Sequence, residues 1–185
     1  DRLKIKNPYL LFVGTLEKRK NIVGLVRSYI ELHKIASKVP DLVLVGSPGF
    51  QYNEIQEEIG KSGLYQKIKI LGFVGEATLA DLYRGCDAFV FLSLEEGFGI
   101  PVIEAMACGV PVISSNTTSL PEVGAGYTWL VDPHDHEAIA QSISMVLQKT
   151  DAVIKQTLEG QIYARKKSWT KVAEDTRIVY EKIIT

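Results

Sequence analysis

The chain has 185 residues, which is enough for one domain with a sizeable hydrophobic core. Hydrophobic residues make up 46% and charged residues 23% of it, proportions that are ordinary for a globular protein. The formal net charge of -1 indicates neither nucleic acid nor an acidic membrane surface as a partner, and no apolar run approaches the roughly 18 residues that a transmembrane helix needs.

Two cysteines, Cys86 and Cys108, are too few for a disulfide framework, and their spacing does not suit a metal site. Both lie in apolar contexts, which is typical of buried thiols in a reducing compartment. No signal peptide is visible at the start of the chain. We therefore expect a cytoplasmic protein, with peripheral attachment of the whole protein to a membrane left open.

Short apolar runs alternate along the chain with stretches in which apolar residues recur at helical spacing. The predicted strands cover residues 9–13, 42–46, 68–72, 88–92, 110–114 and 127–131. The predicted helices cover residues 22–36, 54–61, 79–85, 101–108, 136–147 and 152–166, and a last helix runs from 170 to the end. This alternation predicts an α/β fold, a Rossmann-like parallel sheet of about six strands with helices on both faces.

In such sheets, ligands bind at the carboxyl ends of the strands. The loops that leave those ends are 14–20, 46–50, 72–77, 93–100 and 115–121. The motifs that carry chemical information lie in these loops, in agreement with the predicted fold.

Polar residues mark the starts of two predicted helices. Thr78 with Asp81 three residues later resembles a capping box, and Asp135 is placed to cap the helix of residues 136–147. His134 and His136 flank Asp135, but residues two apart do not share a helix face. The pattern predicts a capped helix start with exposed histidines and no metal site.

The loop and short helix that follow the fourth predicted strand form the most informative stretch. Two glycines bracket Phe98, and the helix after them is apolar on every side except at Glu104. A carboxylate on such a buried helix needs a partner, and a ligand hydroxyl would serve. Glu96 lies eight residues earlier, and the helix start between the two glutamates attracts anions such as phosphate. The pattern indicates a site for hydroxyls and phosphate; the alternative is one solvated glutamate and one on the helix dipole.

Lys18, Arg19 and Lys20 follow the first predicted strand, and Asn21 after them is placed to cap the first helix. Three cations on a loop are either solvated or a clamp for a diphosphate, in which Arg offers a planar fork and Lys a point charge. No D-x-D metal motif is present. A diphosphate bound here would therefore be neutralised by protein cations and a helix dipole instead of a divalent ion.

These residues also carry a family resemblance. Glu96 and Glu104, with seven residues between them within EGFGIPVIEAMACGVPVISS, resemble the E-x7-E signature of the retaining GT-B glycosyltransferases of family GT4. Residues 14–21 are similar to the GTLEPRKN loop of that family, residues 114–123 to its S-N-x-x-S-L-P-E-V run, and residues 131–133 to its V-D-P. The resemblance extends over nearly the whole chain.

The chain departs from the family pattern at three positions. Lys18 stands where proline is frequent, Thr15 where many relatives carry a basic residue, and Gly126 where an acidic residue is common. The change at Thr15 places the binding of phosphate more firmly on Arg19 and Lys20.

The resemblance implies a role for each site residue. Arg19 and Lys20 would bind the donor diphosphate, and Glu104 would hold the ribose hydroxyls. Glu96 would lie beside the sugar as the catalytic residue, either positioning the sugar or acting as a nucleophile. The other implied substrate-binding positions are the base-reading main chain at Val74 and the loop residues Gly97, Phe98, Gly99 and Ile100.

The function that follows is retaining transfer of a sugar, mannose being one candidate, from a nucleotide-diphosphate sugar to an acceptor hydroxyl in polysaccharide or glycolipid biosynthesis. Residues 1–185 would form one nucleotide-sugar-binding domain, the C-terminal half of a GT-B fold, with its last helices at about 152–185. The acceptor-binding domain would precede Asp1, so the chain alone would be inactive. The implied partners are a UDP- or GDP-sugar and, through the other domain, an acceptor glycan or glycolipid, with no metal and no cofactor.

Three alternatives remain at the level of sequence. A sugar-nucleotide epimerase shares the fold, but residues 93–112 resemble the transferases. A non-catalytic nucleotide-sugar-binding module would bind the same ligand without needing Glu96. A receiver-like signalling domain would need an acidic cluster around an aspartate at the end of a central strand, and none is visible.

Overall fold

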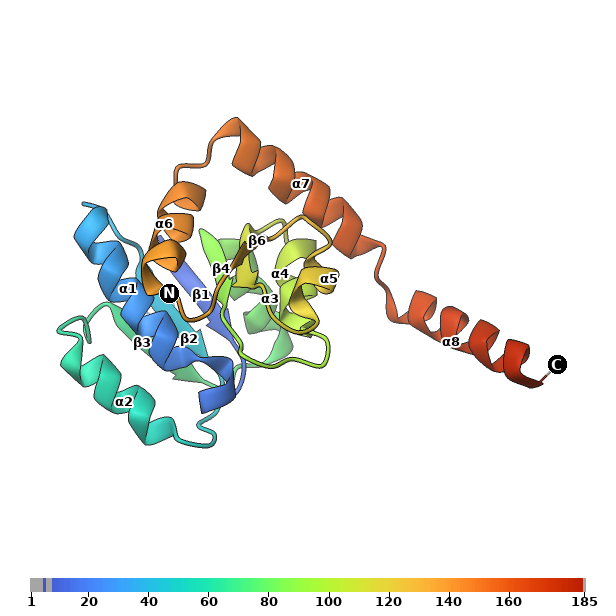
Figure 1. Ribbon diagram of the computed structural model, residues 1–185, viewed down its shortest axis with the longest axis horizontal. Coiled ribbons are helices and arrows are strands. Elements are labelled where there is room, and N and C mark those ends of the chain that lie inside the picture. The colour runs from blue at the N-terminus through green and yellow to red at the C-terminus, as the bar shows by residue number, and fades with distance from the viewer. Residues whose placement is uncertain (1–4, 6–7, 185) are drawn as a thin grey trace.

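The protein has a single sheet of six parallel strands at its centre. The computed structural model describes residue 5 and residues 8–184. Its strand order is β3-β2-β1-β4-β5-β6 (Figure 1). The strands are β1 (Tyr9–Val13), β2 (Asp41–Val45), β3 (Ile68–Gly72), β4 (Ala88–Phe91), β5 (Val112–Ser115) and β6 (Trp129–Val131). The predicted parallel sheet is confirmed, although the last two strands begin two residues later than the sequence pattern indicates.

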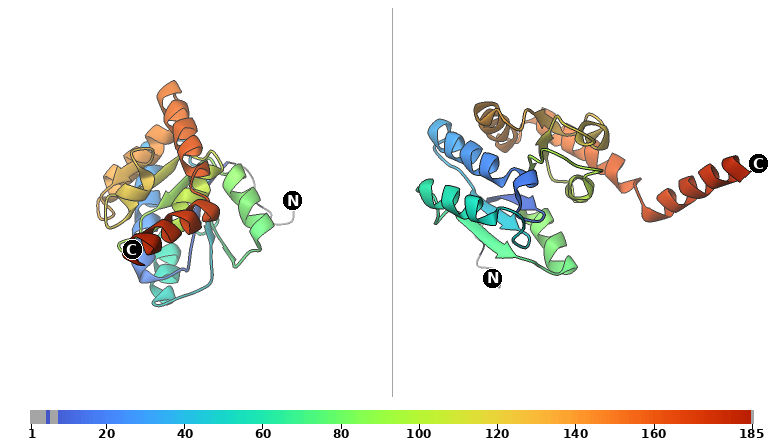
Figure 2. Two further views of the ribbon diagram at one scale, coloured as in Figure 1. Left: turned by 90° about the vertical axis from the view of Figure 1, so that its right-hand side faces the viewer. Right: turned by 60° about the horizontal axis from the view of Figure 1, so that its bottom comes forward.

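Helices cover both faces of this sheet (Figures 1 and 2). The helices are α1 (Ile22–Ile35), α2 (Tyr52–Lys61), α3 (Glu76–Gly85), α4 (Ile100–Ala107), α5 (Leu120–Gly124), α6 (His136–Leu147), α7 (Asp151–Arg165) and α8 (Trp169–Ile184), with a 3₁₀ turn η1 (Lys18–Lys20) before α1. In one group α1 packs against α2 and α6, and in the other α4 packs against α5 and α7. The predicted Rossmann-like layering is therefore present.

The order of the strands reverses between β1 and β4. From β1 the chain moves outward through β2 to β3, and it then returns to pair β4 with the free side of β1. Leu10 lies opposite Ala88, and Leu11 lies opposite Phe89. Because the two neighbouring strands send their connections in different directions, a crevice opens at their carboxyl ends, where open α/β sheets bind ligands.

The core runs through the middle of the sheet as a row of aromatic rings. Phe12 of β1 stacks on Phe91 of β4 at 5.9 Å between ring centroids, and Phe91 stacks on Phe89 at 5.7 Å. Tyr83 of α3 meets Phe89 edge-on at 5.4 Å. All four side chains are buried, as expected for strands that are covered on both faces. At Phe91 the row comes within 5.0 Å of the ammonium of Lys20, in the turn after β1.

The predicted capping box at Thr78 and Asp81 is wrong. The helix begins three residues earlier than predicted, at Glu76, and the N–H of Leu79 already donates to the carbonyl of Gly75 at 2.9 Å. Both Thr78 and Asp81 therefore lie inside α3. The acidic group that faces the positive end of the helix dipole is Glu76.

The last two helices, predicted at about 152–185, are present but differ in their packing; residue 185 itself lies outside the described residues. Helix α7 buries Val153, Gly160 and Ala164 and packs against α4. Helix α8 buries none of its residues and runs away from the body of the protein, as the red helix of Figure 1 shows. Within the described part of the chain, none of the helices is both long enough and apolar enough to cross a membrane.

Candidate functional site

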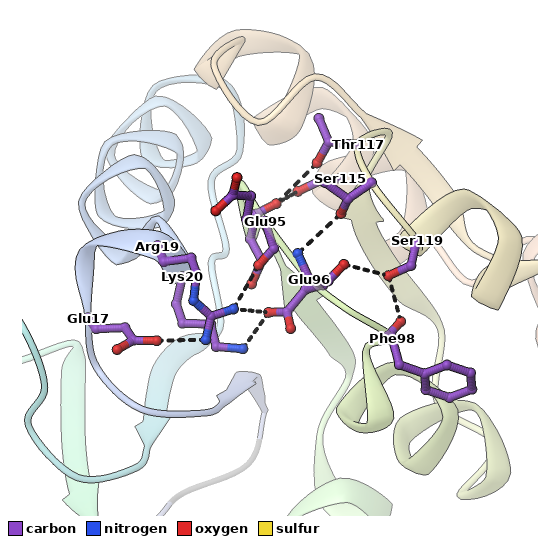
Figure 3. A network of polar contacts seen from close by, with 11 residues as sticks. Glu17, Arg19, Lys20, Glu95, Glu96, Phe98, Ser115, Thr117 and Ser119 are labelled. Atoms are coloured by element: carbon purple, nitrogen blue, oxygen red, sulfur yellow. Dashed lines mark hydrogen bonds and ion pairs between the residues drawn. The ribbon is translucent and has the colours of Figure 1, made fainter.

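The loops after β1 and β4 meet over the crevice at the reversal of strand order. The N–H of Leu94 donates to the carbonyl of Arg19 at 2.9 Å and so joins the two loops directly. Figure 3 shows charged side chains from both loops turned toward one another across this junction. The site predicted from sequence is therefore assembled from segments about 76 residues apart.

The cationic side of the site is the turn η1. Leu16 lies between β1 and this turn and fixes the start of the loop. Its side chain is fully buried, and its N–H donates to the carbonyl of Ser47 at 2.9 Å. Asn21 closes the turn in the left-handed conformation (φ 54°). Its side chain caps no helix, contrary to the sequence prediction; its amide donates instead to the carbonyl of Pro133 at 2.8 Å.

Arg19 is held by two partners on either side of its guanidinium. One terminal nitrogen donates to the carbonyl of Glu95 at 2.7 Å, and the other donates to the Oε1 of Glu17 at 2.8 Å (Figure 3). The side chain of Arg19 is still 43% exposed. The planar fork is thus oriented by the protein while one face of it stays open to a ligand.

Lys20 and Glu96 form the buried ion pair of the site. The ammonium of Lys20 donates to the Oε1 of Glu96, and a terminal nitrogen of Arg19 lies 3.4 Å from the same oxygen. The side chains of Lys20 and Glu96 are each only 10% exposed. The ammonium also lies 5.0 Å from the centroid of the Phe91 ring, where a cation is attracted to the face of the ring.

The glycine-rich loop is fixed by α5 and the segment before it. The hydroxyl of Ser119 donates to the carbonyls of Glu96, at 2.9 Å, and Phe98, at 3.0 Å (Figure 3). Gly99 precedes α4 with φ 101°, and a Cβ there would lie 2.6 Å from the side chain of Leu120. Any other residue at Gly99 would strain the loop. At the start of α4, Pro101 has no N–H and the N–H of Val102 donates to the carbonyl of Gly99 at 3.0 Å, so the N–H of Ile100 is the one that the first turn leaves for an anion.

Glu104 lies on α4 at the far side of this loop. The hydroxyl of Tyr83, from α3, donates to the Oε2 of Glu104 at 3.0 Å. Tyr83 is only 2% exposed, whereas Glu104 is exposed. Burial first, and the neighbouring Glu104 second, raise the pKa of Tyr83 well above its usual value, so its hydroxyl remains a proton donor at neutral pH.

The remaining predicted positions lie at the same edge of the sheet. Gly97 and Phe98 are exposed in the loop before α4. Val74 follows β3, two strands away from β1, and is half-buried beside the exposed Phe73. The described hydrogen bonds do not connect Val74 to the cluster of Arg19, Lys20 and Glu96.

Sequence reasoning missed the residues that hold the predicted ones. These are Glu17 beside Arg19, Ser119 beneath the glycine-rich loop, and Tyr83 beside Glu104. Tyr83 carries no sequence signal for this contact, because its apolar neighbours at helical spacing equally indicate a packed core residue.

His134 and His136 do not contribute to a metal cluster. The residues that the structure describes contain no group of three or more His, Cys, Asp or Glu side chains placed to hold a metal ion. Asp135 instead caps α6 by accepting from the N–H of Ala138 at 2.9 Å, which confirms the predicted cap. The neighbouring Asp132 accepts from the N–H of His134 at 2.8 Å.

Comparison with known proteins agrees with this geometry. Residues 2–167 match the family described as "Glycosyl transferases group 1". The chain is 36% identical over 173 residues to the O-antigen chain mannosyltransferase B of Escherichia coli, covering 94% of this chain and 45% of the relative. It is 33% identical over 150 residues to the O-antigen chain mannosyltransferase RfbU of Salmonella typhimurium, covering 81% of this chain and 41% of the relative.

Solved structures show the same fold. Sucrose-phosphate synthase from Thermosynechococcus elongatus superposes with a TM-score of 0.84 at 26% identity, over 99% of this chain and 47% of that one. HepE of Anabaena in complex with UDP superposes with a TM-score of 0.83 at 21% identity, over 94% of this chain and 48% of that one. The chain thus spans less than half the length of the relatives it matches. By the match over residues 2–167, the chain belongs to the group 1 glycosyltransferases, which are of the GT4 type with the GT-B fold.

Proposed function

We propose that the chain is the donor-binding domain of a retaining glycosyltransferase that uses a nucleoside-diphosphate sugar. The observation that carries the proposal is the meeting of Arg19, Lys20 and Glu96 at the carboxyl ends of β1 and β4. Two cations from one loop face a carboxylate and a helix start from the other, a combination that suits a diphosphate joined to a polyhydroxyl sugar.

Charge on the leaving diphosphate would be stabilised by the protein itself. Negative charge develops on the diphosphate as the bond from the sugar to the phosphate oxygen breaks, and cations placed beforehand stabilise that charge most effectively. Arg19 and Lys20 are held in place before any ligand arrives. The N–H groups of Phe98, Gly99 and Ile100 would add to them at the start of α4. We propose that transfer needs no metal ion for this reason.

The other residues divide the rest of the donor between them. Glu104 would accept hydrogen bonds from the ribose hydroxyls, and the main chain at Val74 would contact the base. Glu96 would lie beside the sugar, with Gly97 next to it in the loop. Its contacts with two cations hold the carboxylate in place, which suits a residue that orients the sugar.

The relatives suggest the class of donor and acceptor. The relatives from Escherichia coli and Salmonella typhimurium are named as O-antigen chain mannosyltransferases, and structures of HepE are in complex with UDP or UDP-glucose. We therefore propose a UDP- or GDP-sugar donor, with mannose as a candidate sugar, and a glycan or glycolipid acceptor. Because the chain spans less than half of these relatives, a second domain before residue 1 would bind the acceptor. The whole enzyme would act in the cytoplasm or at the inner face of a membrane.

Calorimetric titration with UDP, GDP and ADP, with and without EDTA, tests the proposal. One of the three should bind, EDTA should not change the affinity, and Glu104→Ala should weaken it. The double variant Arg19→Ala/Lys20→Ala should lower the affinity by at least about tenfold, since it removes two charge-assisted contacts. The matched control is Arg27→Ala/Lys34→Ala on α1, which removes two exposed cations that pair with Glu58 and Glu31.

Three results would count against the proposal. Absence of binding by any nucleotide at millimolar concentration would remove its basis. A requirement for a divalent ion would contradict the neutralisation by protein cations. Full activity of the longer protein after Glu96→Ala would instead favour a nucleotide-binding module without a catalytic role.

A further inference from the structure

Tyr83 combines two properties that seldom occur together. Its side chain is buried in the core, and yet its hydroxyl reaches an exposed carboxylate of the candidate site, the Oε2 of Glu104, at 3.0 Å. A buried tyrosine hydroxyl needs a partner, and most find one in the backbone nearby. Tyr9 and Tyr29 do so here, because they donate to the carbonyls of Leu82 and Pro40 at 2.7 Å.

The position of the Tyr83 hydroxyl is fixed by packing. The ring meets Phe89 edge-on at 5.4 Å, and Phe89 is itself stacked on Phe91 at 5.7 Å within β4. A side chain wedged in this way cannot change rotamer without opening the core. The packing of the ring therefore fixes the position of the hydroxyl that contacts Glu104.

The side chain of Glu104 has this one hydrogen bond in the described part of the chain. Tyr83 donates a single proton to Oε2, and no other hydrogen bond or ion pair of the described residues involves the Glu104 carboxylate. The second oxygen, Oε1, is left free on an exposed side chain. A neutral donor also leaves the negative charge of the carboxylate in place, so the free oxygen is a strong acceptor for hydroxyl groups.

We propose that Tyr83 is a positioning residue that holds one oxygen of Glu104, so that the carboxylate presents the other to the ribose diol of the nucleotide. This inference rests on the proposed function, in which Glu104 binds the ribose. It adds that recognition of the ribose depends on a tyrosine in the core, on a different helix from the carboxylate. Without that hydroxyl, an exposed glutamate would rotate among several conformers, and the second hydrogen bond would cost more side-chain entropy.

The ratio of two affinities tests this role. Calorimetry would compare UDP with 2′,3′-dideoxy-UDP, and GDP with 2′,3′-dideoxy-GDP, on the unaltered protein and on Tyr83→Phe. The unaltered protein should bind the ribonucleotide roughly tenfold or more tightly than the dideoxynucleotide, because the dideoxynucleotide cannot form the hydrogen bond to the charged carboxylate. In Tyr83→Phe that ratio should fall at least about threefold, while the affinity for the dideoxynucleotide stays the same.

Two further variants separate positioning from packing. Tyr29→Phe removes an equally buried hydroxyl far from the site and should leave the ratio unchanged. In a Glu104→Gln background, Tyr83→Phe should change the ratio no further, because a residue that acts only through Glu104 has nothing left to act on. Thermal unfolding would confirm that each variant folds before its affinities are compared.

The possible failures are distinguishable. If the unaltered protein binds neither nucleotide, the proposed function is overturned together with this role. If it binds the diphosphates but does not distinguish the dideoxy forms, the ribose contact of Glu104 and this role are overturned, while the diphosphate site remains. If it distinguishes them and Tyr83→Phe keeps the ratio, or lowers both affinities equally, the role of Tyr83 alone is overturned.

Discussion

The two glutamates of the candidate site lie eight residues apart on one segment, but the protein treats them differently. Glu96 is 10% exposed and is neutralised by Lys20 and Arg19. Glu104 is exposed, and its described partner is the uncharged hydroxyl of Tyr83. Both arrangements are built on the same strand, because Lys20 lies over the ring of Phe91 and Tyr83 packs against Phe89.

Under the proposed function, this difference divides the candidate site into an anion-binding half at Arg19, Lys20 and Glu96 and a hydroxyl-binding half at Tyr83 and Glu104. A buried ion pair adds little net stability, because desolvation of the two charges offsets their attraction. At Glu96, the pair instead keeps two cations in place, where they could donate hydrogen bonds to a phosphate oxygen. At Glu104 an uncharged donor preserves a full negative charge for a neutral ligand group. The first half should therefore respond to changes of charge, and the second to changes of hydrogen bonding.

The largest effect is expected from Lys20→Met, which disrupts the anion-binding half of the site. The substitution leaves Glu96 almost buried with Arg19 as its remaining cationic partner, and it removes one of the two cations proposed to bind phosphate. We expect the free energy of unfolding to fall by roughly 2–4 kcal/mol, as when one partner of a buried ion pair is removed. The affinity for the nucleoside diphosphate that binds should fall at least about tenfold. Urea denaturation and calorimetry measure the two effects.

The double variant Lys20→Met/Glu96→Gln separates these effects. Removing both charges should restore most of the lost stability but not the share of the affinity that the ammonium of Lys20 supplies. If stability did not recover, the contribution of Lys20 would come from its contact with Phe91 and not from its charge.

A smaller effect of opposite sign is expected from Glu96→Gln alone. In the free protein the carboxylate of Glu96 occupies the two cations that would bind phosphate. With that competitor neutralised, free UDP or GDP should bind about three- to tenfold more tightly, and the gain should shrink as salt is added. Turnover by the longer protein should decrease, because the sugar loses its carboxylate. Weaker binding of the free diphosphate would show that Glu96 and the phosphate do not share the cations.

Much of the fold could be predicted because its signals are local. A strand is indicated by a short apolar run and a helix by apolar residues at helical spacing, and each of these signals lies within a window of about 15 residues. The alternation of strands and helices therefore follows from the sequence. The reversal of strand order, which places β1 beside β4, depends on pairing between distant segments and carries no local signal. Likewise, the pattern predicts α8, but its lack of buried residues depends on what surrounds it.

The candidate site shows the same division. The cations at Arg19 and Lys20 and the carboxylates at Glu96 and Glu104 are visible in short motifs. The ion pair of Lys20 with Glu96 spans 76 residues, and the contact of Tyr83 with Glu104 joins two different helices. Such contacts depend on the depth and direction of side chains in the packed core, which sequence spacing does not give.

A further test measures how the stability of the protein changes at alkaline pH when Tyr83, in the hydroxyl-binding half of the site, is altered. Because burial and Glu104 raise the pKa of Tyr83 in the folded protein, its contribution to stability is complete below the unfolded pKa near 10 and is lost as the pH rises above it. At about pH 10.5 this loss should amount to roughly 1 kcal/mol. Between pH 8 and pH 10.5, Tyr83→Phe should therefore lose less stability than the unaltered protein, measured by urea denaturation. The remaining loss would come from Tyr9, Tyr29, Cys86 and Cys108, whose pKa values are also raised by burial. Equal losses would place the titration elsewhere.

The smallest effect should be seen at Cys108, which ends α4 and reports the charge of Glu104. Burial raises the pKa of the Cys108 thiol, Arg84 lowers it, and Glu104 raises it again. Glu104→Gln should therefore increase the rate of alkylation of Cys108 by iodoacetamide near pH 8, by less than roughly threefold. The more deeply buried Cys86, whose pKa is raised chiefly by burial, serves as the internal standard.

Glu96→Gln is the matched control for this measurement, because it removes a carboxylate from the same segment. Glu96 is compensated by two cations and is not among the groups that shift the pKa of Cys108. The rate at Cys108 should therefore change with Glu104→Gln and stay constant with Glu96→Gln. If Cys108 were alkylated at the same rate in the unaltered protein, Glu104→Gln and Glu96→Gln, Glu104 would not act as an uncompensated charge. The distinction between an anion-binding half and a hydroxyl-binding half would then lose its electrostatic basis.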